Sequence, residues 1–338
     1  MRKFYVILAL CIAAPPVCAA PPVLDQACVM GLAETAGDAT TLAQIRKQCT
    51  VASDSAVEPE GLVSQQAEES QDTDVDADIS LVEQRLTAER EAAARPFSIL
   101  AHKPNYFLVA AYNWEGWESD IENNDIESQF QLSLKVPLAT GLFGDRMDLY
   151  GAYTNRSFWQ MYNSDNSEPF RETNHEPELW AQFRNDWQIW GLTNSVNAFG
   201  WVHQSNGRSG DFSRSWNRVY ANFLFERGRW AFVIKPWVWV SKDRDKSDSP
   251  DIDEYMGHGE LRLAYGRNGH VLSAMMRNQL ESGFDRGAVE LSWSFPVFNY
   301  PYLKGYVQYF YGYGESLIDY NNKVNRLGIG ISVTDWLD

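Results

Sequence analysis

The chain has 338 residues, a formal net charge of -16 and 44% hydrophobic residues. The negative charge argues against nucleic acid as a partner, because a phosphate backbone attracts basic surfaces. After the amino-terminal segment no run of eighteen apolar residues occurs, which excludes membrane-spanning helices and leaves a soluble protein or a β-barrel. The 13 Trp, 16 Tyr and 17 Phe favour the barrel, because aromatic side chains concentrate in strands and at membrane interfaces.

The chain begins with the pattern of a secretory signal peptide. Two basic residues precede an apolar run, and small residues follow near Ala19, so we expect residues 1–19 to be removed on export. Residues 20–95 then form an N-terminal periplasmic extension. Within it Cys28 and Cys49 are expected to form a disulfide, because an exported protein folds in an oxidising compartment.

The remainder of this extension divides into two parts. Residues 51–78 are acidic, rich in Ser and Gln and nearly free of aromatic residues, which predicts a linker that cannot bury a core. Residues 79–94 have helix-forming composition and end just before Pro96. They predict a short helix ahead of the main domain.

From residue 104 onward, apolar and polar residues alternate with a period of two. One example is the apolar series Phe130, Leu132, Leu134, Val136 and Leu138. These runs suit tilted membrane strands, and an even number of them can close without an exposed edge. We therefore expect an all-β, 12-stranded antiparallel transmembrane β-barrel over residues 96–338. The predicted strands are 104–113, 126–138, 147–160, 173–188, 193–205, 215–226, 229–241, 255–267, 270–281, 285–297, 302–313 and 324–336.

Three polar residues fall on the apolar face of two neighbouring predicted strands. His203 and Ser205 share a face with Trp201, because side chains repeat every second position. Asn217 lies opposite the face of Arg218, and the charged face must line the lumen. Polar groups that face lipid cost free energy, so this cluster indicates a functional site.

These residue types fit ester hydrolysis. Ser205 would act as the nucleophile, His203 as the base that takes its proton, and Asn217 as the group that orients the imidazole. Asn is neutral where the usual triad has a carboxylate, so it stabilises the imidazolium less. A cation at the loop and a backbone N–H near Gly207 could stabilise the oxyanion.

Three segments resemble a known family. HQSNGRSGDFSRSWNR (203–218), YTNRSFWQMYNSDNSEPFRETNHEPEL (153–179) and YGYGESLIDYN (311–321) are similar to segments of outer-membrane phospholipase A. That family consists of calcium-dependent esterases of the Gram-negative outer membrane. The resemblance covers about residues 96–338. It implies hydrolysis of acyl esters of phospholipids and lysophospholipids, at both the A1 and the A2 position, in the cell outer membrane.

The resemblance also implies roles for single residues. His203, Ser205 and Asn217 match the catalytic triad, and Gly207 matches the oxyanion-hole amide. Calcium (Ca²⁺) would be held by two backbone carbonyls and one hydroxyl, from Arg208, Ser213 and Ser167 respectively. The family's active form is a homodimer, and the resemblance implies the same for this chain.

The sequence departs from the family pattern in three places. Asn155 stands where a glutamine at the dimer interface is expected. The chain ends in Trp336-Leu337-Asp338 where many outer-membrane barrels have a terminal Phe. The extension at residues 20–95 is longer than the family requires.

Other polar and aromatic groups have simpler interpretations. Glu172 and Glu176 fall on one strand face and His175 on the other, which favours a solvated strand end over a metal cluster. The acidic run 242–254 contains Asp245, a possible second calcium ligand, but favours a surface loop. Two aromatic pairs predict interface girdles or outward packing: Trp237 with Trp239, and Tyr309 with Tyr311.

Two other classes of protein remain open at this point. A passive barrel, either a small porin or a structural protein, would also have lumen charges of both signs, here Lys135, Arg218, Lys235, Glu290 and Arg326. Such a barrel predicts ion conductance and no dependence on Ser205. A soluble secreted esterase is the third possibility, and it predicts a protein that needs no detergent.

Overall fold

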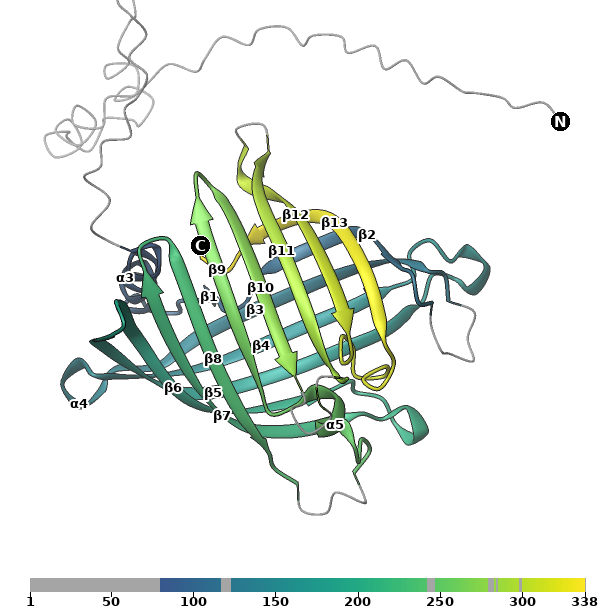
Figure 1. Ribbon diagram of the computed structural model, residues 1–338, viewed down its shortest axis with the longest axis horizontal. Helices are drawn as coiled ribbons and strands as arrows, with labels where there is room; N and C mark the ends of the chain where they lie inside the picture. The colour runs from purple at the N-terminus through teal and green to yellow at the C-terminus, as the bar shows by residue number, and fades with distance from the viewer. Residues whose placement is uncertain are drawn as a thin grey trace, which may run out of the picture. The chain divides into compact units, whose positions relative to one another are not determined.

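The computed structural model describes residues 80–116, 123–241, 247–278, 283, 285–297 and 300–337. The predicted signal peptide, the two cysteines of the extension and the acidic linker lie outside these residues. Strands β2 to β13 form one closed antiparallel barrel, in which β3 pairs with both β2 and β4 (Figure 1). The short strand β1 (Leu100–Ala101) adds to the edge of β3. The predicted 12-stranded barrel is therefore confirmed.

The twelve strands lie close to their predicted positions. They are β2 (Asn105–Asn113), β3 (Ile126–Gly141), β4 (Met147–Trp159), β5 (Phe170–Ile189), β6 (Leu192–Ser205), β7 (Ser215–Arg227), β8 (Trp230–Trp239), β9 (Gly259–Arg267), β10 (His270–Asn278), β11 (Gly287–Val297), β12 (Tyr300–Gly312) and β13 (Val324–Thr334). The largest difference is at β9, which begins four residues later than predicted. Ile252–Met256 form a short helix, α5, and Gly257 ends it with a φ of 67°. The strand cannot start before this turn.

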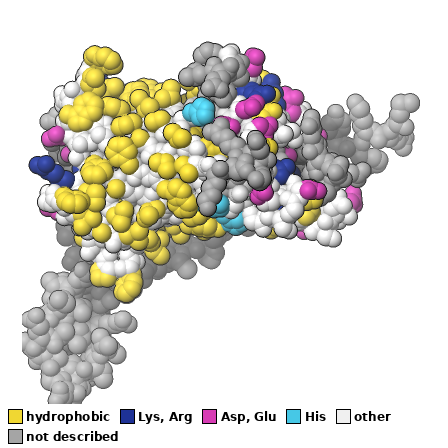
Figure 2. Space-filling model, turned by 90° about the horizontal axis from the view of Figure 1, so that it is seen from below, with side chains coloured by type: hydrophobic (Ala, Val, Ile, Leu, Met, Phe, Trp, Pro, Cys, Tyr) yellow, Lys and Arg dark blue, Asp and Glu magenta, His cyan; other side chains and the backbone are white. Residues whose placement is uncertain are grey.

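The two faces of the wall differ as the alternation predicts. Leu132, Leu138, Ile329 and Val333 are each at least half exposed on the outside of the barrel. Hydrophobic side chains cover most of the wall seen in Figure 2, and charged side chains gather toward its ends. Such an apolar belt is what a membrane-spanning barrel presents to lipid.

Charged groups of both signs fill the lumen. Lys135, Arg218, Glu290 and Arg326 are all buried there, as predicted. Arg326 pairs with Glu315, and Arg262 lies 3.6 Å from Glu290. Because their neighbours are charges of the opposite sign, these groups remain buried at a tolerable free-energy cost.

The predicted outward position of Trp237 and Trp239 is wrong. Both rings are buried inside the barrel, where Trp237 donates from Nε1 to the Gly257 carbonyl at 2.8 Å. Val238, which is 67% exposed, occupies the lipid face between them. The Arg218 guanidinium lies 5.2 Å from the centre of the Trp237 ring. This cation–π contact favours the position of the Trp237 ring inside the lumen.

The two ends of the barrel have different connections. At one end β5, β7 and β9 turn directly into the next strand, and Asn268 and Gly269 both have positive φ, as a tight hairpin turn requires. A four-residue segment, α4 (Leu142–Asp145), connects β3 to β4 at the same end. At the opposite end the connections are long, and they include 160–169, 206–214 and 313–323.

Helix α3 (Leu81–Ala93) packs into the short-turn end of the barrel and confirms the helix predicted at 79–94 (Figure 1). Its N-cap Ser80 accepts a hydrogen bond from the Glu83 amide at 3.0 Å. Val82 forms a buried cluster with Ala231 and Ala264 of the lumen wall. Among the described residues, no helix has the length and apolar character needed to cross a membrane.

Candidate active site

The long-loop ends of β6 and β7 bring two of the predicted site residues together. His203 and Asn217 are direct partners in the ladder between these strands. The Nδ1 atom of His203 lies 3.0 Å from Oδ1 of Asn217. An amide oxygen can only accept, so Nδ1 carries a proton and Nε2 is left as the basic atom.

Ser205 lies on the same outer face, two residues farther along β6. Its ladder partners are Ser215 on β7 and His175 on β5. In the part of the chain that the structure describes, its hydroxyl has no hydrogen bond to His203. Hydrogen bonds of this kind are often formed only when substrate is bound.

The loop after Ser205 is shaped by the side chain of Asn206. Its Nδ2 donates to the Phe212 carbonyl at 2.8 Å, and its Oδ1 accepts from the amide of Arg214 at 3.0 Å. The loop contains the 3-10 turn η3 (Gly210–Phe212). Gly207 has a φ of 66°, a conformation that favours glycine. The Gly207 backbone is therefore held beside the end of β6.

The predicted calcium ligands lie in neighbouring loops of the rim. Ser167, with a φ of 60°, precedes β5, and Arg208 and Ser213 follow β6. The Ser213 hydroxyl donates to Oδ2 of Asp248 at 2.5 Å, so an exposed hydroxyl and an exposed carboxylate are close together. Oxygen donors of this kind fit Ca²⁺. No cluster of three His, Cys, Asp or Glu side chains occurs among the described residues.

Asp248 was not singled out from the sequence. Its neighbour Asp245, the residue that the sequence did suggest, lies outside the described residues. The only sequence signal for Asp248 was its place in the acidic run 242–254. Asp248 follows the end of β8 by nine positions and lies 35 positions after Ser213, so the contact between them depends on how the loops fold.

Arg208 also ties the loop to strand β5. Its guanidinium donates to the Arg171 carbonyl, and its Nε lies 3.4 Å from Oε2 of Glu172. Glu172 is fully buried, so the predicted solvated strand end is wrong at this residue. Its other oxygen accepts from the Ile318 amide at 3.2 Å, which joins the 313–323 loop to the same group.

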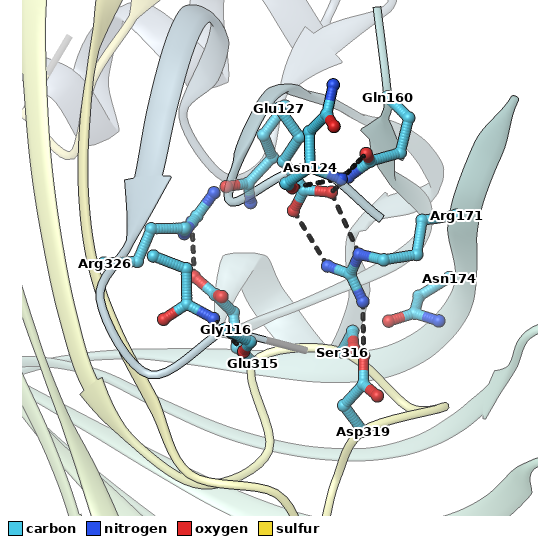
Figure 3. A network of polar contacts seen from close by, with 12 residues as sticks. Gly116, Asn124, Glu127, Gln160, Arg171, Asn174, Glu315, Ser316, Asp319 and Arg326 are labelled. Atoms are coloured by element: carbon cyan, nitrogen blue, oxygen red, sulfur yellow. Dashed lines mark hydrogen bonds and ion pairs between the residues drawn. The ribbon is translucent and has the colours of Figure 1, made fainter. Parts of the chain in front are cut away.

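A buried polar network lies beneath these loops (Figure 3). Arg171 forms two hydrogen bonds with the carboxylate of Glu127, at 2.8 and 2.9 Å, and a further ion pair with Asp319. Gln160 donates to the same carboxylate at 3.0 Å. These contacts join β3 and β5 to the 160–169 and 313–323 connections. The loop that contains Gly207 and Ser213 contacts this network where Arg208 donates to the Arg171 carbonyl.

A model of the phospholipase A1 family matches residues 82–333. A phospholipase A1 of Proteus vulgaris is 39% identical over 251 residues, which cover 71% of this chain and 83% of that protein. The chain belongs to the phospholipase A1 family. Another member, from Escherichia coli strain K12, is 39% identical over 252 residues, with 71% of this chain and 83% of that protein covered.

Solved structures of this family have the same fold. The outer membrane phospholipase dimer of Salmonella typhi with bound calcium matches with a TM-score of 0.65 and 37% identity, over 71% of this chain and 94% of that chain. Outer membrane phospholipase A of Escherichia coli matches with a TM-score of 0.64 and 37% identity, over 71% and 99%. With the apolar belt of the barrel, these likenesses place this family member in the outer membrane.

Proposed function

We propose that this phospholipase A1 family member hydrolyses acyl esters of phospholipids and lysophospholipids, at both the A1 and the A2 position, through Ser205, His203 and Asn217. The observation that carries the proposal is the 3.0 Å contact between His203 and Asn217 on the lipid-facing wall, beside Ser205. A nucleophile on that wall meets an acyl ester without the lipid entering the lumen. An Escherichia coli relative was solved as an active-site mutant in which an asparagine is replaced by alanine, which supports an asparagine in this role.

The proposed reaction proceeds through an acyl-enzyme. Ser205 Oγ attacks the ester carbonyl carbon while its proton passes to Nε2 of His203. The bond from carbon to the glycerol oxygen then breaks, and His203 returns the proton to that oxygen. Water repeats the sequence with the same base and releases the fatty acid. Asn217 holds the imidazole in the tautomer that makes Nε2 basic.

Two further elements support the developing negative charge. The Gly207 amide is the proposed oxyanion donor, held by the loop that Asn206 shapes. The proposed calcium ligands are the Ser167 hydroxyl and the backbone carbonyls of Arg208 and Ser213. Calcium, when bound, supplies positive charge beside the ester carbonyl.

We further propose that the active form is a homodimer. The calcium-bound Salmonella typhi relative is a dimer, which supports this assignment. Asn155 lies on the outer wall next to His175, its ladder partner on β5. Its amide would face the second copy at the interface. We take residues 96–338 as the phospholipase barrel and residues 1–19 as the signal peptide.

A passive porin is the weaker alternative. Lumen charges pair with one another, as Arg262 does with Glu290 and Arg326 with Glu315, and the two cavities among the described lumen side chains have volumes of only about 110 and 200 Å³. Helix α3 also fills part of the short-turn end. These features oppose steady ion flow.

The test is hydrolysis of a phospholipid in detergent micelles by the wild type and by Ser205→Ala, each with calcium and with chelator. We expect release of fatty acid only from the wild type with calcium. Activity of a folded Ser205→Ala barrel equal to that of the wild type would contradict the proposal. Activity that persists with chelator would contradict the calcium requirement in this proposal.

A further inference from the structure

A second histidine lies beside Ser205. His175 is the direct ladder partner of Ser205 across β5 and β6. Side chains at such positions share a face, with their Cβ atoms about 5 Å apart. The sequence placed His175 on the face opposite Glu172 and Glu176, which is the outer face, and assigned it no role. The half-buried ring therefore borders the space above the proposed nucleophile.

One edge of the His175 ring is held by strand β4. Nδ1 lies 2.6 Å from the Tyr153 hydroxyl and 3.5 Å from Nδ2 of Asn155. Tyr153 also stacks on the ring, with centroids 6.1 Å apart. A phenol O–H and an amide N–H can both donate to Nδ1, so the neutral ring carries its proton on Nε2. Nε2 has a proton in the cationic ring as well.

The other edge faces the loop of the site. A Cβ placed on Gly207 would lie 3.6 Å from both Nε2 and Cδ2 of His175. Nε2 has no hydrogen-bond partner among the residues that the structure describes. This N–H has a fixed direction, lies next to the Gly207 backbone and has no partner among the described residues, so it is suited to bind an oxygen of the substrate.

We propose that His175 binds the substrate by donating from Nε2–H to the carbonyl oxygen of the scissile ester, beside the Gly207 amide. Tyr153 is the positioning residue, because its hydroxyl fixes the tautomer and the ring plane. The inference rests on the proposed function, since it takes Ser205 as the nucleophile. The imidazole exchanges no proton with the substrate, so His203 remains the base.

The test compares His175→Phe, His175→Gln and Tyr153→Phe on a phospholipid and on a p-nitrophenyl fatty-acid ester, which has no phosphate. We expect His175→Phe to lower kcat about 100-fold on both substrates, as expected for the loss of one oxyanion donor. His175→Gln keeps an N–H donor and should stay within about tenfold of the wild type. Tyr153→Phe should cost about fivefold, the effect of one ordinary hydrogen bond.

Three results would overturn this proposal. An unchanged kcat for folded His175→Phe would show that the ring does not contact the reacting ester. A loss on the phospholipid alone would assign the contact to the phosphodiester. A loss that disappears at high enzyme concentration, together with a weaker dimer in sedimentation, would assign His175 to the subunit interface. The Ser205→Ala variant distinguishes failure of the His175 proposal from failure of the proposed function, because full activity of that variant would contradict the proposed function itself.

Discussion

The lumen and the outer wall of this barrel both contain polar side chains, but these side chains differ in how many hydrogen-bond and ion-pair partners they have within the fold. In the lumen, Arg171 has carboxylate partners on two sides. On the outer wall, Ser205 and Nε2 of His175 have no hydrogen-bond partner among the described residues. Polar groups that stabilise a fold have their hydrogen-bond partners within it, whereas polar groups that bind a substrate keep a donor or an acceptor free for the substrate. The lumen network supports the rim from below, and the outer wall holds the proposed reactive groups.

The largest expected effect is a loss of activity on substitution of a residue of the outer wall. Replacement of His203 by Phe removes the proposed base while the new side chain still suits the lipid face. We expect phospholipid hydrolysis to fall by at least about three orders of magnitude, with no change in barrel folding as judged by heat modifiability on gels. A variant that folds and retains more than a tenth of the activity would contradict the proposed role of His203.

A lumen substitution should act on the fold instead. Arg171→Ala leaves the buried Glu127 and Asp319 carboxylates without their shared cation, and breaking a buried ion pair costs about 3–5 kcal/mol. Urea unfolding in detergent measures this change in the free energy of unfolding.

The matched control is Arg286→Ala, which removes an ion pair with Glu254 at the exposed rim. An exposed pair contributes at most about 1 kcal/mol. Equal losses for Arg171→Ala and Arg286→Ala would mean that the network in Figure 3 does not support the rim.

Asn217→Ala should give an intermediate effect on the wall. The His203 ring loses its orienting acceptor at 3.0 Å but keeps its chemistry. Since Asn is neutral, its removal costs less than loss of a triad carboxylate, and we expect kcat to fall about 10- to 100-fold. Asn217→Asp should retain more activity than Asn217→Ala. The reverse order, measured on the same micelles, would argue against an orienting role.

The smallest expected effect is a pH dependence in the packing of helix α3 against the barrel. Burial opposes the charged form of Glu89, but Lys135 at 2.7 Å and Arg85 outweigh it and lower the pKa of Glu89 below its usual range. Because the folded-state pKa of Glu89 is lowered, its ion pairs stabilise the packing of α3 against the barrel at pH values above the ordinary pKa of about 4.5. This contribution is lost as the pH falls through the folded-state pKa of Glu89.

Trypsin cleavage within α3, after brief exposure to a series of pH values, measures this docking. We expect protection near pH 7 and faster cleavage after exposure below about pH 4. Glu89→Gln should be cleaved faster already at neutral pH and should lose most of the pH dependence. A pH dependence that is the same in Glu89→Gln and in the wild type would assign it to another group.

Much of the barrel could be predicted because its pattern is local. The apolar series at Leu132 and Leu134 identifies both the strand and its lipid-facing side, since side chains alternate along any strand. The same rule places His203, Ser205 and Asn217 on one wall. The prediction for Trp237 and Trp239 was wrong because it gave aromatic character more weight than this rule, which places both residues on the lumen face. The rule also could not show that residues 252–256 form a helix.

The contacts between distant segments were not predictable in this way. Glu172 read as a solvated strand end, yet it is buried between Arg208 and the amide of Ile318. The position of His175 beside Gly207 depends on the register of β5 against β6 and on a positive φ in the loop. Asp248 reaches Ser213 only through the fold of a loop that has no periodic pattern.

The sequence by itself determined the strand count, the face of each strand and the wall on which the candidate site lies, because an alternation with a period of two depends only on neighbouring residues. Only the tertiary structure decided the register between strands, the pairing of the lumen charges and the packing of the rim loops. Those features join residues far apart in the chain, such as Arg171 with Asp319 and His175 with Ser205. Their geometry depends on barrel closure, which brings every strand into contact with two others.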